Sequence, residues 1–520
     1  MSTRTSLIAS LAAVERESAT RTAVVDGSRR LTFAAVADRS NRAAHVLRGM
    51  LGAEVANVAL LVGNAAEAVE LDVACVKAGL GRVNLNPRLA EDERRYVLGD
   101  ARARMLVYDT EYADFAAALH QAEPGVGLLR IGGAGPGRSY EDELSRASSA
   151  YPTLRPDPDA PSLIMYTSGT TGRPKGAVWT VATRTAAVRN MLLNELDRAA
   201  VVGMVHAGSV SHGSGSKILP IYLRGGSNIL LRKFEPAAFF RAVQQERATA
   251  SFMVPTMVQM LVDEADSLAE AAMGSMVQIT YGGAKMPLPT IRAALDRFGK
   301  KFTQVYGSCE APHPVLILPR HEHTLDDHVL SVAGRRSLGT TMRFGDPAAE
   351  PEPGATGELL VGGPHIFGGY HANPDATAEV LVDGFFRTGD VATLHADGYV
   401  EIVGRTKDMI ISGGFNVYPA EVERVLLEYP GVTGACVYGI PDDQWGERVV
   451  AAITVAADQM IHVASVASAC RAKLAGYKLP RMIRIVNGFP VGNTGKVLRA
   501  EVRRLHLALD AGALTTQPQY

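Results

Sequence analysis

The sequence predicts an α/β protein in which mostly parallel strands are covered by helices. Strand-like apolar runs alternate with helix-like segments, and this alternation is typical of parallel sheets covered on both faces. The chain has 520 residues, more than one hydrophobic core normally holds, so two or more domains are expected. Beyond about residue 410 the pattern becomes shorter and self-contained, which favours a small C-terminal unit.

Short apolar runs mark the expected strands, and periodic segments mark the helices. Near the N-terminus strand and helix alternate over Asn57–Val62, Ala65–Ala78, Arg82–Leu85, Glu91–Gly99 and Arg104–Tyr108. Further strands are expected over Val201–Val205, Asn228–Leu231, Ala250–Met253, Val277–Thr280 and Phe302–Val305. In the last part, helices are expected over Pro419–Glu428 and Val463–Leu474, and strands over Ala435–Tyr438, Val449–Val455 and Met482–Val486. A final helix is expected to end near Leu507.

The bulk composition excludes several classes of protein. With 47% hydrophobic and 21% charged residues the chain reads as an ordinary soluble globular protein, and its net charge of −1 gives no reason to expect nucleic acid as a partner. No signal peptide and no apolar run of about 18 residues is found, so we expect a cytoplasmic protein without a transmembrane segment. Four scattered cysteines without a CxxC pair argue against a zinc site and against disulfides: Cys75, Cys309, Cys436 and Cys470.

The most informative stretch is Tyr166–Val178, YTSGTTGRPKGAV. Its glycines allow main-chain N–H groups to approach phosphate oxygens, and its hydroxyls add further donors. Lys175 adds a compact positive charge for the same phosphates. An ordinary turn between a strand and a helix is the alternative. The spacing does not fit a Walker A loop, because Gly172 comes too early and Gly176 follows the lysine.

Other short motifs are ambiguous when each is taken alone. Tyr281–Ala284 fits either a tight turn or a backbone against which a flat base lies. Tyr306–Glu310 combines an aromatic ring with a carboxylate suited to Mg²⁺, although a surface loop would look similar. Arg387–Asp390 places a carboxylate just after a turn, as ribose recognition requires, or forms an Asx turn. Two cationic segments follow, Gly404–Asp408 and Gly492–Lys496.

In this order, the motifs YTSGTTGRPKG, RTGD, GRTKD and GNTGK resemble those of the adenylate-forming superfamily, which includes acyl- and aryl-CoA synthetases, nonribosomal adenylation domains and beetle luciferases. The resemblance extends over essentially the whole chain. It implies a large N-terminal domain of layered, mostly parallel sheets over residues 1–406. A small C-terminal α+β lid over residues 407–520 would follow, with a hinge near Lys407.

The resemblance also implies roles for individual residues. Lys496 would bridge the acid carboxylate and the α-phosphate, His212 would lie near the acyl carboxylate, Glu310 would hold Mg²⁺, and Lys175 would assist departure of pyrophosphate. Other residues would hold ATP: Thr167, Ser168, Gly169, Thr170, Thr171, Gly282, Gly283, Ala284, Tyr306, Gly307, Cys309, Asp390 and Arg405. Most relatives carry Thr where Cys309 stands, and a thiol is a weaker donor than a hydroxyl.

Among the branches of this superfamily, the acid–CoA ligases fit best. Amino-acid adenylation is disfavoured because no Asp or Glu lies between Ala199 and Phe234 to pair with a substrate ammonium. Gly413, Gly414 and Trp445 match the aromatic and glycine arrangement that contacts CoA.

We therefore expect ATP-dependent conversion of a carboxylic acid, through an acyl-AMP, into its CoA thioester. A medium- or long-chain fatty acid is the first expectation and an aryl or cyclic acid the alternative. Pocket candidates are His206–Ser211, Met253–Thr256, Tyr281–Ala284 and Gly307–Pro312. A non-catalytic nucleotide-binding relative is the other alternative, and a homodimer is possible.

Overall fold

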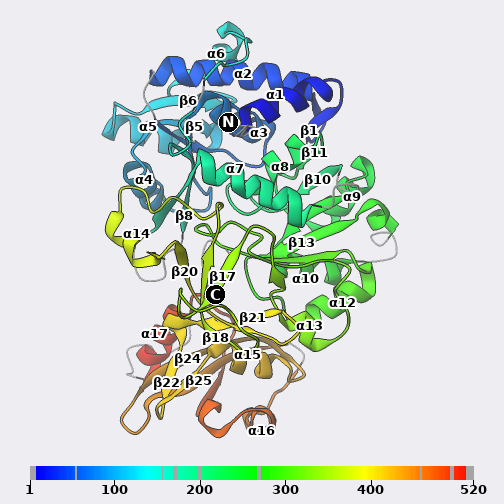
Figure 1. Cartoon of the computed structure of the whole chain (residues 1–520), viewed down its shortest axis with the longest axis vertical. Coiled ribbons are helices and arrows are strands. Elements are labelled where there is room, and N and C mark those ends of the chain that lie inside the picture. The colour runs from blue at the N-terminus through cyan, green and yellow to red at the C-terminus, as the bar shows by residue number, and fades with distance from the viewer. Residues whose placement is uncertain are drawn as a thin grey trace. The chain divides into compact units, whose positions relative to one another are not determined.

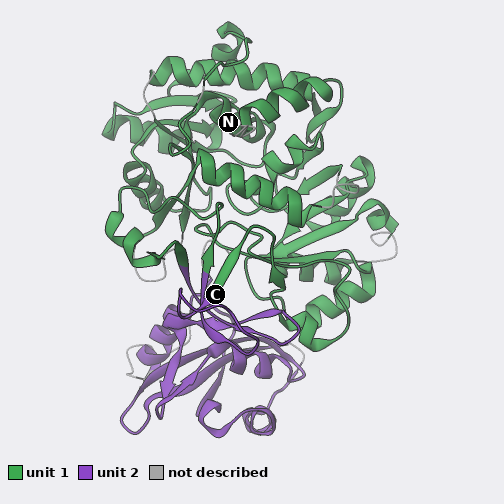
Figure 2. Cartoon of the chain, in the orientation of Figure 1, with its two compact units in different colours: residues 1–342, 361–386 green, residues 343–360, 387–520 purple. Residues whose placement is uncertain are grey.

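The computed structural model describes residues 7–52, 56–154, 156–167, 173–196, 202–265, 271–456, 459–491 and 497–510. The chain divides into two compact units, shown in different colours in Figure 2. Unit 1 comprises residues 1–342 and 361–386, and unit 2 comprises residues 343–360 and 387–520. The hinge that we expect near Lys407 lies within unit 2 and stays a prediction about motion.

Unit 1 contains a seven-stranded sheet with the strand order β7-β6-β5-β3-β4-β8-β9. Its strands β5, β6 and β8 are labelled in Figure 1. All of its strand pairs are parallel except β8 with β9, which are antiparallel. The strands are β3 (Asn57–Leu61), β4 (Gly81–Asn84), β5 (Ala103–Asp109), β6 (Gly127–Ile131), β7 (Arg138–Ser139), β8 (Pro161–Thr167) and β9 (Lys175–Thr180).

Unit 1 also contains a nine-stranded sheet with the order β16-β15-β14-β13-β12-β10-β11-β1-β2. Its central six strands are parallel, and β2, β15 and β16 join antiparallel at the edges. The strands are β1 (Thr22–Asp26), β2 (Arg29–Thr32), β10 (Gly203–His206), β11 (Ser227–Leu230), β12 (Ala250–Met253), β13 (Gln278–Gly282), β14 (Phe302–Tyr306), β15 (Leu316–Leu318) and β16 (Arg335–Arg336).

Helices cover both sheets, as the alternation of patterns predicts. The helices of unit 1 are α1 (Leu7–Glu17), α2 (Phe33–Leu51), α3 (Ala66–Ala78), α4 (Glu91–Asp100), α5 (Ala113–Ala122), α6 (Tyr140–Arg146), α7 (Val181–Asn190), α8 (Ile218–Leu223), α9 (Pro236–Glu246), α10 (Pro255–Glu264), α12 (Leu288–Phe298), α13 (Asp327–Ser331) and α14 (Pro374–Val380). Residues of α2 and α3 share one apolar cluster with Val24 of β1 and Val58 of β3, so these helices pack against both sheets.

Helix α3 is the central element of this layer, since all 13 of its residues are buried. A helix enclosed on every side can carry charged residues only where each has a partner. Its four charged residues each meet an opposite charge, in the pairs Arg29–Glu67, Arg39–Glu70, Arg82–Asp72 and Glu15–Lys77. These pairs connect α3 to neighbouring elements and fix its position in the layer.

Unit 2 is built around a five-stranded sheet with the order β23-β22-β25-β24, in which β26 pairs parallel with β25. Its elements are β22 (Ile410–Ser412), β23 (Phe415–Val417), α15 (Pro419–Leu427), β24 (Val432–Asp442), β25 (Gly446–Val455), α16 (Val463–Lys473), β26 (Met482–Ile485) and α17 (Arg499–Asp510). A further sheet has strands from the residue ranges of both units: β17 (Thr341–Phe344), β18 (Thr356–Gly362), β19 (Leu381–Val382), β20 (Phe385–Leu394) and β21 (Val400–Arg405).

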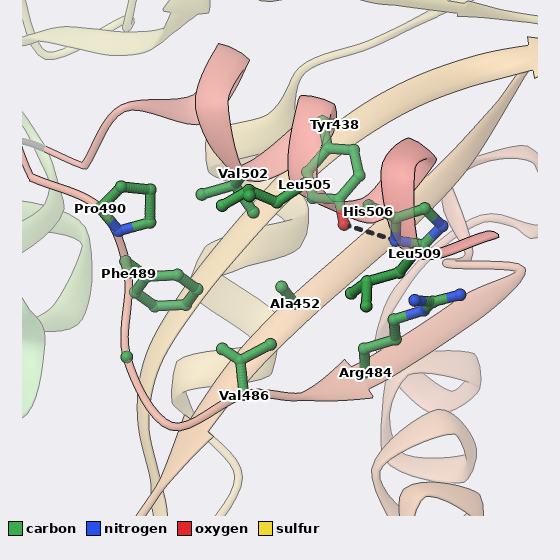
Figure 3. Close-up of a pocket in the computed structure, with 11 residues that line it drawn as sticks. Tyr438, Ala452, Arg484, Val486, Phe489, Pro490, Val502, Leu505, His506 and Leu509 are labelled. Carbon is green, nitrogen blue, oxygen red and sulfur yellow. Dashed lines mark hydrogen bonds between the residues drawn. The ribbon is translucent and has the colours of Figure 1, made fainter. Parts of the chain in front are cut away.

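The predicted fold class is confirmed, and the expected strands and helices lie within a few residues of those observed. The four cysteines are free, as their spacing predicts. None of the helices in the described part of the chain is long and apolar enough to cross a membrane. Unit 2 encloses a cavity of about 40 Å³ between β24, β26 and α17, where Tyr438 hydrogen-bonds His506 (Figure 3). That volume holds at most a water molecule or two, so no substrate fits there.

Candidate active site

The candidate residues of unit 1 gather at one edge of the nine-stranded sheet. Strands β10, β12, β13 and β14 are parallel, so their carboxyl ends lie at the same edge. His212 follows β10, Gly282–Ala284 lie at the end of β13, and Tyr306–Glu310 follow from β14. Ligands of open α/β sheets bind at the carboxyl ends of the strands. The sheet therefore brings together three segments that are almost 100 residues apart in sequence.

His212 lies on the loop between β10 and α8, and it is half-buried. Its Nδ1 atom is 3.0 Å from the hydroxyl of Ser211, whose carbonyl accepts a hydrogen bond from Asn84 at 3.1 Å. Burial lowers the pKa of His212, and the nearby charge of Arg88 lowers it further. The imidazole of His212 is therefore neutral, and this imidazole need not release a proton before the acid substrate binds beside it.

The glycines at the end of β13 are required by the backbone. A Cβ atom on Gly282 would lie 2.5 Å from the carbonyl oxygen of Val305, and Gly283 has a φ of +81°. Only glycine tolerates both the close approach to β14 and the left-handed conformation. The result is a bare stretch of main chain beside the half-buried ring of Tyr306. This surface fits the prediction that a flat base lies there, which stays a prediction.

The loop that carries Glu310 is tightly held by hydrogen bonds. The Ser308 hydroxyl accepts from the N–H groups of Glu310 and Ala311, at 3.2 and 3.1 Å. The indole of Trp179 on β9 donates to the carbonyl of Cys309 at 2.7 Å. These bonds fix the main chain around Cys309 independently of its thiol, so the predicted phosphate contact of that residue does not determine the shape of the loop.

Glu310 is connected to the phosphate-loop hairpin through Tyr370. The Tyr370 hydroxyl donates to Oε1 of Glu310 at 2.8 Å, and Nζ of Lys175 lies 5.2 Å from the centre of the tyrosine ring. The segment around Tyr370 pairs with β9 through Ala177, so these three side chains are carried by adjoining backbone. Glu310 is only 9% exposed, and burial raises the pKa of Tyr370, which therefore remains a donor.

The predicted phosphate loop is the segment that joins β8 to β9. Thr167 and Lys175 are direct partners across this antiparallel pair. The predicted phosphate-binding residues Ser168, Gly169, Thr170 and Thr171 lie outside the described residues. The sequence pattern predicts a phosphate loop here, and Lys175, which follows that segment, is connected to Glu310 through Tyr370.

The single carboxylate of Glu310 fits a Mg²⁺ ion of the kind that accompanies a nucleotide. Magnesium is usually held by one or two carboxylates together with substrate phosphates and water. Across the described ranges no group of three or more His, Cys, Asp or Glu residues forms a cage for a metal. Tyr370 occupies Oε1, and a carboxylate offers further lone pairs to a cation.

Two predicted nucleotide residues meet in unit 2. Nε of Arg405 on β21 lies 2.6 Å from Oδ1 of Asp390 on β20, and the two residues are register partners in an antiparallel pair. Gly389 has a φ of +70°, which allows the turn before Asp390. The pair places a carboxylate and a guanidinium side by side, an arrangement that suits ribose hydroxyls and a phosphate.

The predicted hinge residue Lys407 lies on a 3₁₀ turn, η5 (Thr406–Asp408). Burial lowers its pKa, as does the neighbouring Arg405. Arg499, at the start of α17, donates to Asp408 at 2.8 Å and to Glu423 at 2.6 Å. The predicted catalytic Lys496 lies outside the described residues, but the helix that begins three residues after it is anchored beside Lys407 through Arg499.

The predicted CoA contact of unit 2 is compact. The N–H of Gly413 donates to the carbonyl of Trp445 at 2.8 Å, and a Cβ atom on Gly413 would lie 2.8 Å from the indole. The guanidinium of Arg481 lies 5.3 Å from the ring centre, and Trp445 remains 36% exposed. Gly413 and Gly414 both have positive φ, at +59° and +81°. An aromatic face is thus held on a glycine turn, as the sequence predicts.

Two family models match the chain. The model of the AMP-binding enzyme covers residues 11–371, and the model of the AMP-binding enzyme C-terminal domain covers residues 421–496. The chain belongs to the AMP-binding enzyme family. It is an AMP-forming acid–CoA ligase, and such an enzyme uses a carboxylic acid, ATP and CoA. The resemblance to the adenylate-forming superfamily, in its acid–CoA ligase branch, is confirmed.

Several relatives match this chain over nearly its whole length. A feruloyl-CoA synthase of an Amycolatopsis species is 40% identical over 486 residues, which are 93% of this chain and 95% of that protein. The medium/long-chain fatty acid–CoA ligase FadD8 of Mycobacterium tuberculosis is 32% identical over 494 residues, 92% of this chain and 86% of that one. The structure of ATP-bound MatB from Rhodopseudomonas palustris matches with a TM-score of 0.87 and 30% identity, covering 97% of this chain and 99% of MatB.

Tyr370 was not identified by sequence reasoning. It follows two glycines in the segment GGYH, and nothing local in that segment indicates a partner 60 residues away. The sequence also does not indicate the buried ion pair between Lys217 and Glu195, because Glu195 lies just before the acid-free stretch Ala199–Phe234. In both cases the pairing is visible only in the three-dimensional structure, because neither the spacing nor the composition of the sequence indicates it.

Proposed function

We propose that this AMP-binding enzyme activates an aryl carboxylic acid and transfers it to CoA. The observation that carries the proposal is the convergence of the loops of His212, Gly282–Ala284 and Tyr306–Glu310 at the carboxyl edge of the nine-stranded sheet. A nucleotide against the bare glycine backbone would have its phosphates toward Glu310 and the β8–β9 hairpin. The acid would lie on the side of His212.

Two displacement steps make up the reaction. A carboxylate oxygen of the acid attacks the α-phosphorus of ATP, and pyrophosphate leaves. The sulfur of CoA then attacks the acyl carbon and loses its proton, while AMP leaves with the oxygen that joined it to the acid. Lys496 would stabilise the negative charge that builds up in the first step, where two anions must approach each other. Lys175 and the hydroxyls of the phosphate loop would hold the phosphates that depart.

Magnesium, when bound at Glu310, would supply positive charge to the same phosphates. Tyr370 would hold the Glu310 carboxylate in place for it. Asp390 and Arg405 would bind the ribose, and Trp445 with Gly413 would contact the pantetheine arm of CoA. These roles follow the motif positions of the family, and the geometry of the described residues is compatible with each of them.

An aryl acid is favoured over the fatty acid that we first expect from the sequence. The feruloyl-CoA synthase is the more similar of the two relatives, at 40% against 32% identity. Stacked aromatic rings also lie at the same sheet edge: Phe252 and His313 have ring centres 5.5 Å apart and planes tilted by 17°. Flat side chains of this kind suit a planar ring, whereas an extended alkyl chain needs a longer apolar channel.

The test is AMP formation with ATP, CoA and a panel of carboxylic acids. We expect cinnamic and benzoic acids to give higher kcat/KM than saturated acids of 8 to 16 carbons. The control is the same panel without CoA, in which pyrophosphate release should stop after about one turnover if the acyl-AMP stays bound. Faster turnover of the saturated acids would contradict the aryl proposal while leaving the acid–CoA ligase in place.

A further inference from the structure

Three ionisable side chains that the proposed reaction does not use form a buried cluster in unit 1. Lys217 is paired with Oε2 of Glu195, and its Nζ lies 3.0 Å from Nδ1 of His313. The side chains of Lys217 and Glu195 have no exposed surface at all, whereas His313 keeps 15% of its side-chain surface exposed. The cluster therefore reaches open space through the histidine ring.

The cluster is positioned by elements around the carboxyl edge of the nine-stranded sheet. Glu195 ends a π-helical turn, η2 (Met191–Glu195), which continues α7, and π turns occur frequently at functional sites. Lys217 lies on the 3₁₀ turn η3 (Gly215–Lys217), after β10, and His313 follows the Glu310 loop. The side chains of Asn190 and Ser337 both donate to the carbonyl of Pro314, which fixes the loop of His313.

The charges within the cluster fix which atom of His313 carries a proton. Burial opposes ionisation of Glu195, but the charge of Lys217 holds the pKa of Glu195 at about 2. Nδ1 of His313 lies 3.0 Å from Nζ of Lys217 and 3.3 Å from Oε2 of Glu195, so the nearer lysine is its hydrogen-bond partner. The carboxylate is thus ionised; burial lowers the pKa of Lys217 and the charge of Glu195 opposes that shift. An amine N–H of Lys217 donates to Nδ1 of His313. The histidine is neutral, since burial lowers its pKa, and its remaining proton lies on Nε2.

Nε2 of His313 points toward the loop that carries His212. It lies 3.2 Å from the hydroxyl of Ser216, which donates to the carbonyl of Gly213 at 2.7 Å. A Cβ atom on Gly213 would lie 2.8 Å from the ring of Phe252, on which His313 stacks. The polar pair Ser216–His313 and the ring of Phe252 are therefore adjacent. Ser216 follows closely in sequence on His206–Ser211, a segment that we assign to the acid pocket.

We infer that Ser216 and His313 form the polar end of the acid pocket, where they hydrogen-bond an oxygen substituent on the ring of the aryl acid. This inference rests on the proposed function. The ring of His313, which stacks on Phe252, contacts the planar ring of the acid, and a phenol or methoxy oxygen shares Nε2–H with the oxygen of Ser216. Lys217 and Glu195 are positioning residues, because they determine the tautomer of His313 while their own side chains are fully buried.

A purely structural role for the cluster is less consistent with its composition. Burying two opposite charges and an imidazole costs desolvation, and a buried ion pair replaced by well-packed apolar side chains is often as stable. Oε1 of Glu195 is buried and has no hydrogen-bond partner among the residues that the structure describes, which adds to that cost. A cluster that holds one hydrogen-bond donor toward the substrate would explain why this desolvation cost is tolerated. A preorganised polar contact discriminates between ligands far better than an apolar wall does.

The inference is tested by comparing four acids of nearly equal shape: cinnamate and its 4-methyl, 4-hydroxy and 4-methoxy derivatives. The wild-type enzyme should use the two oxygenated acids with kcat/KM values about tenfold or more above the 4-methyl acid, because only they accept the hydrogen bond. Equal use of all four acids would overturn the inference and leave the aryl proposal standing. Turnover of saturated acids but of no cinnamate would contradict the proposed function itself.

Variants then assign the contact to its residues. His313→Phe keeps a ring on Phe252 but loses the donor, so the preference for oxygenated acids should fall to about one- to twofold. Ser216→Ala is a milder second variant and should weaken the preference without loss of the 4-methyl reaction. The double change Glu195→Gln and Lys217→Met should reduce the same ratio, an effect that a merely structural role would not produce. His321→Phe makes the same substitution at a histidine with a 77% exposed side chain, and it should keep the wild-type ratio.

Discussion

The phenolic hydroxyl of Tyr370 donates a 2.8 Å hydrogen bond to Oε1 of Glu310. Lys175 lies over the same ring, with its Nζ 5.2 Å from the centre. One tyrosine thus connects the carboxylate that we assign to Mg²⁺ with the cation that we assign to the departing phosphates. The backbone holds Tyr370 in this position, because its segment pairs with β9 at Ala177.

Tyr370→Phe should therefore impair adenylation without disturbing the fold. The phenyl ring keeps the contact with Lys175, but Glu310 loses a charge-assisted hydrogen bond, which we expect to lower kcat/KM for ATP about tenfold. The Mg²⁺ concentration for half-maximal rate should rise, because the carboxylate is no longer held. Pyrophosphate release at increasing Mg²⁺ measures both. Tyr112→Phe, on a tyrosine that contacts Arg94, is the control, and an unchanged Mg²⁺ dependence in Tyr370→Phe would contradict the assignment.

Lys496→Ala should separate the two half-reactions. The ammonium is needed while the carboxylate approaches the α-phosphate, so formation of acyl-AMP should be lost. Conversion of supplied acyl-AMP to acyl-CoA should remain largely intact, since that step develops no charge between two anions. Single-turnover assays of each step measure this, and an equal loss in both would show that the assignment of Lys496 is wrong.

Trp445→Ala should raise the KM for CoA with little effect on pyrophosphate release. The indole is 36% exposed, so its removal also costs packing in unit 2, about 2 to 3 kcal/mol, and the KM is measured well below the unfolding temperature of the variant. Gly413→Ala is a second route to the same defect, because its Cβ would lie 2.8 Å from the ring. A CoA dependence that is unchanged in both variants would exclude this surface from CoA binding.

The sequence predicts most of the fold because the elements that form the sheets are local patterns. The strand at Ala250–Met253 is observed with the predicted bounds, and the others are shifted by only a few residues. The antiparallel partner β9 was not predicted, since Lys175–Thr180 continues directly from a loop that was identified by its glycines and hydroxyls. A strand that adds at an edge depends on its neighbour as much as on its own pattern.

The candidate site was predictable only where residues lie within one motif. Glu310 and His212 each stand in a recognisable segment, whereas Tyr370 acts on Glu310 from 60 residues away. Lys217 shows the limit most clearly. Its segment contains no acid between Ala199 and Phe234, yet its partner Glu195 lies just outside and is already neutralised by it. Glu195 is thus already paired with Lys217 and is not available to a substrate ammonium, so an amino-acid substrate stays disfavoured.

The stability of unit 1 should decrease as the pH falls below about 6.5, and His206 is one cause. It is fully buried between Ser214 and Asn228, and burial lowers its pKa from 6.5 to about 4. Between these values the unfolded chain binds a proton that the folded protein does not, so acid favours unfolding. For this residue the loss should reach about 2 kcal/mol at pH 5 relative to pH 7.5.

His206→Gln isolates this effect, because a carboxamide can still donate to Asn228 and accept from Ser214 but does not titrate. The variant should be less stable than the wild type at pH 7.5 and should lose less stability on going to pH 5. Thermal unfolding across that range gives the comparison, with His321→Gln as the exposed control that keeps the wild-type slope. His323 and His365, whose pKa values burial also lowers to about 4, should account for part of the remaining slope. A His206→Gln slope as steep as that of the wild type would mean that His206 is protonated in the folded state at pH 5.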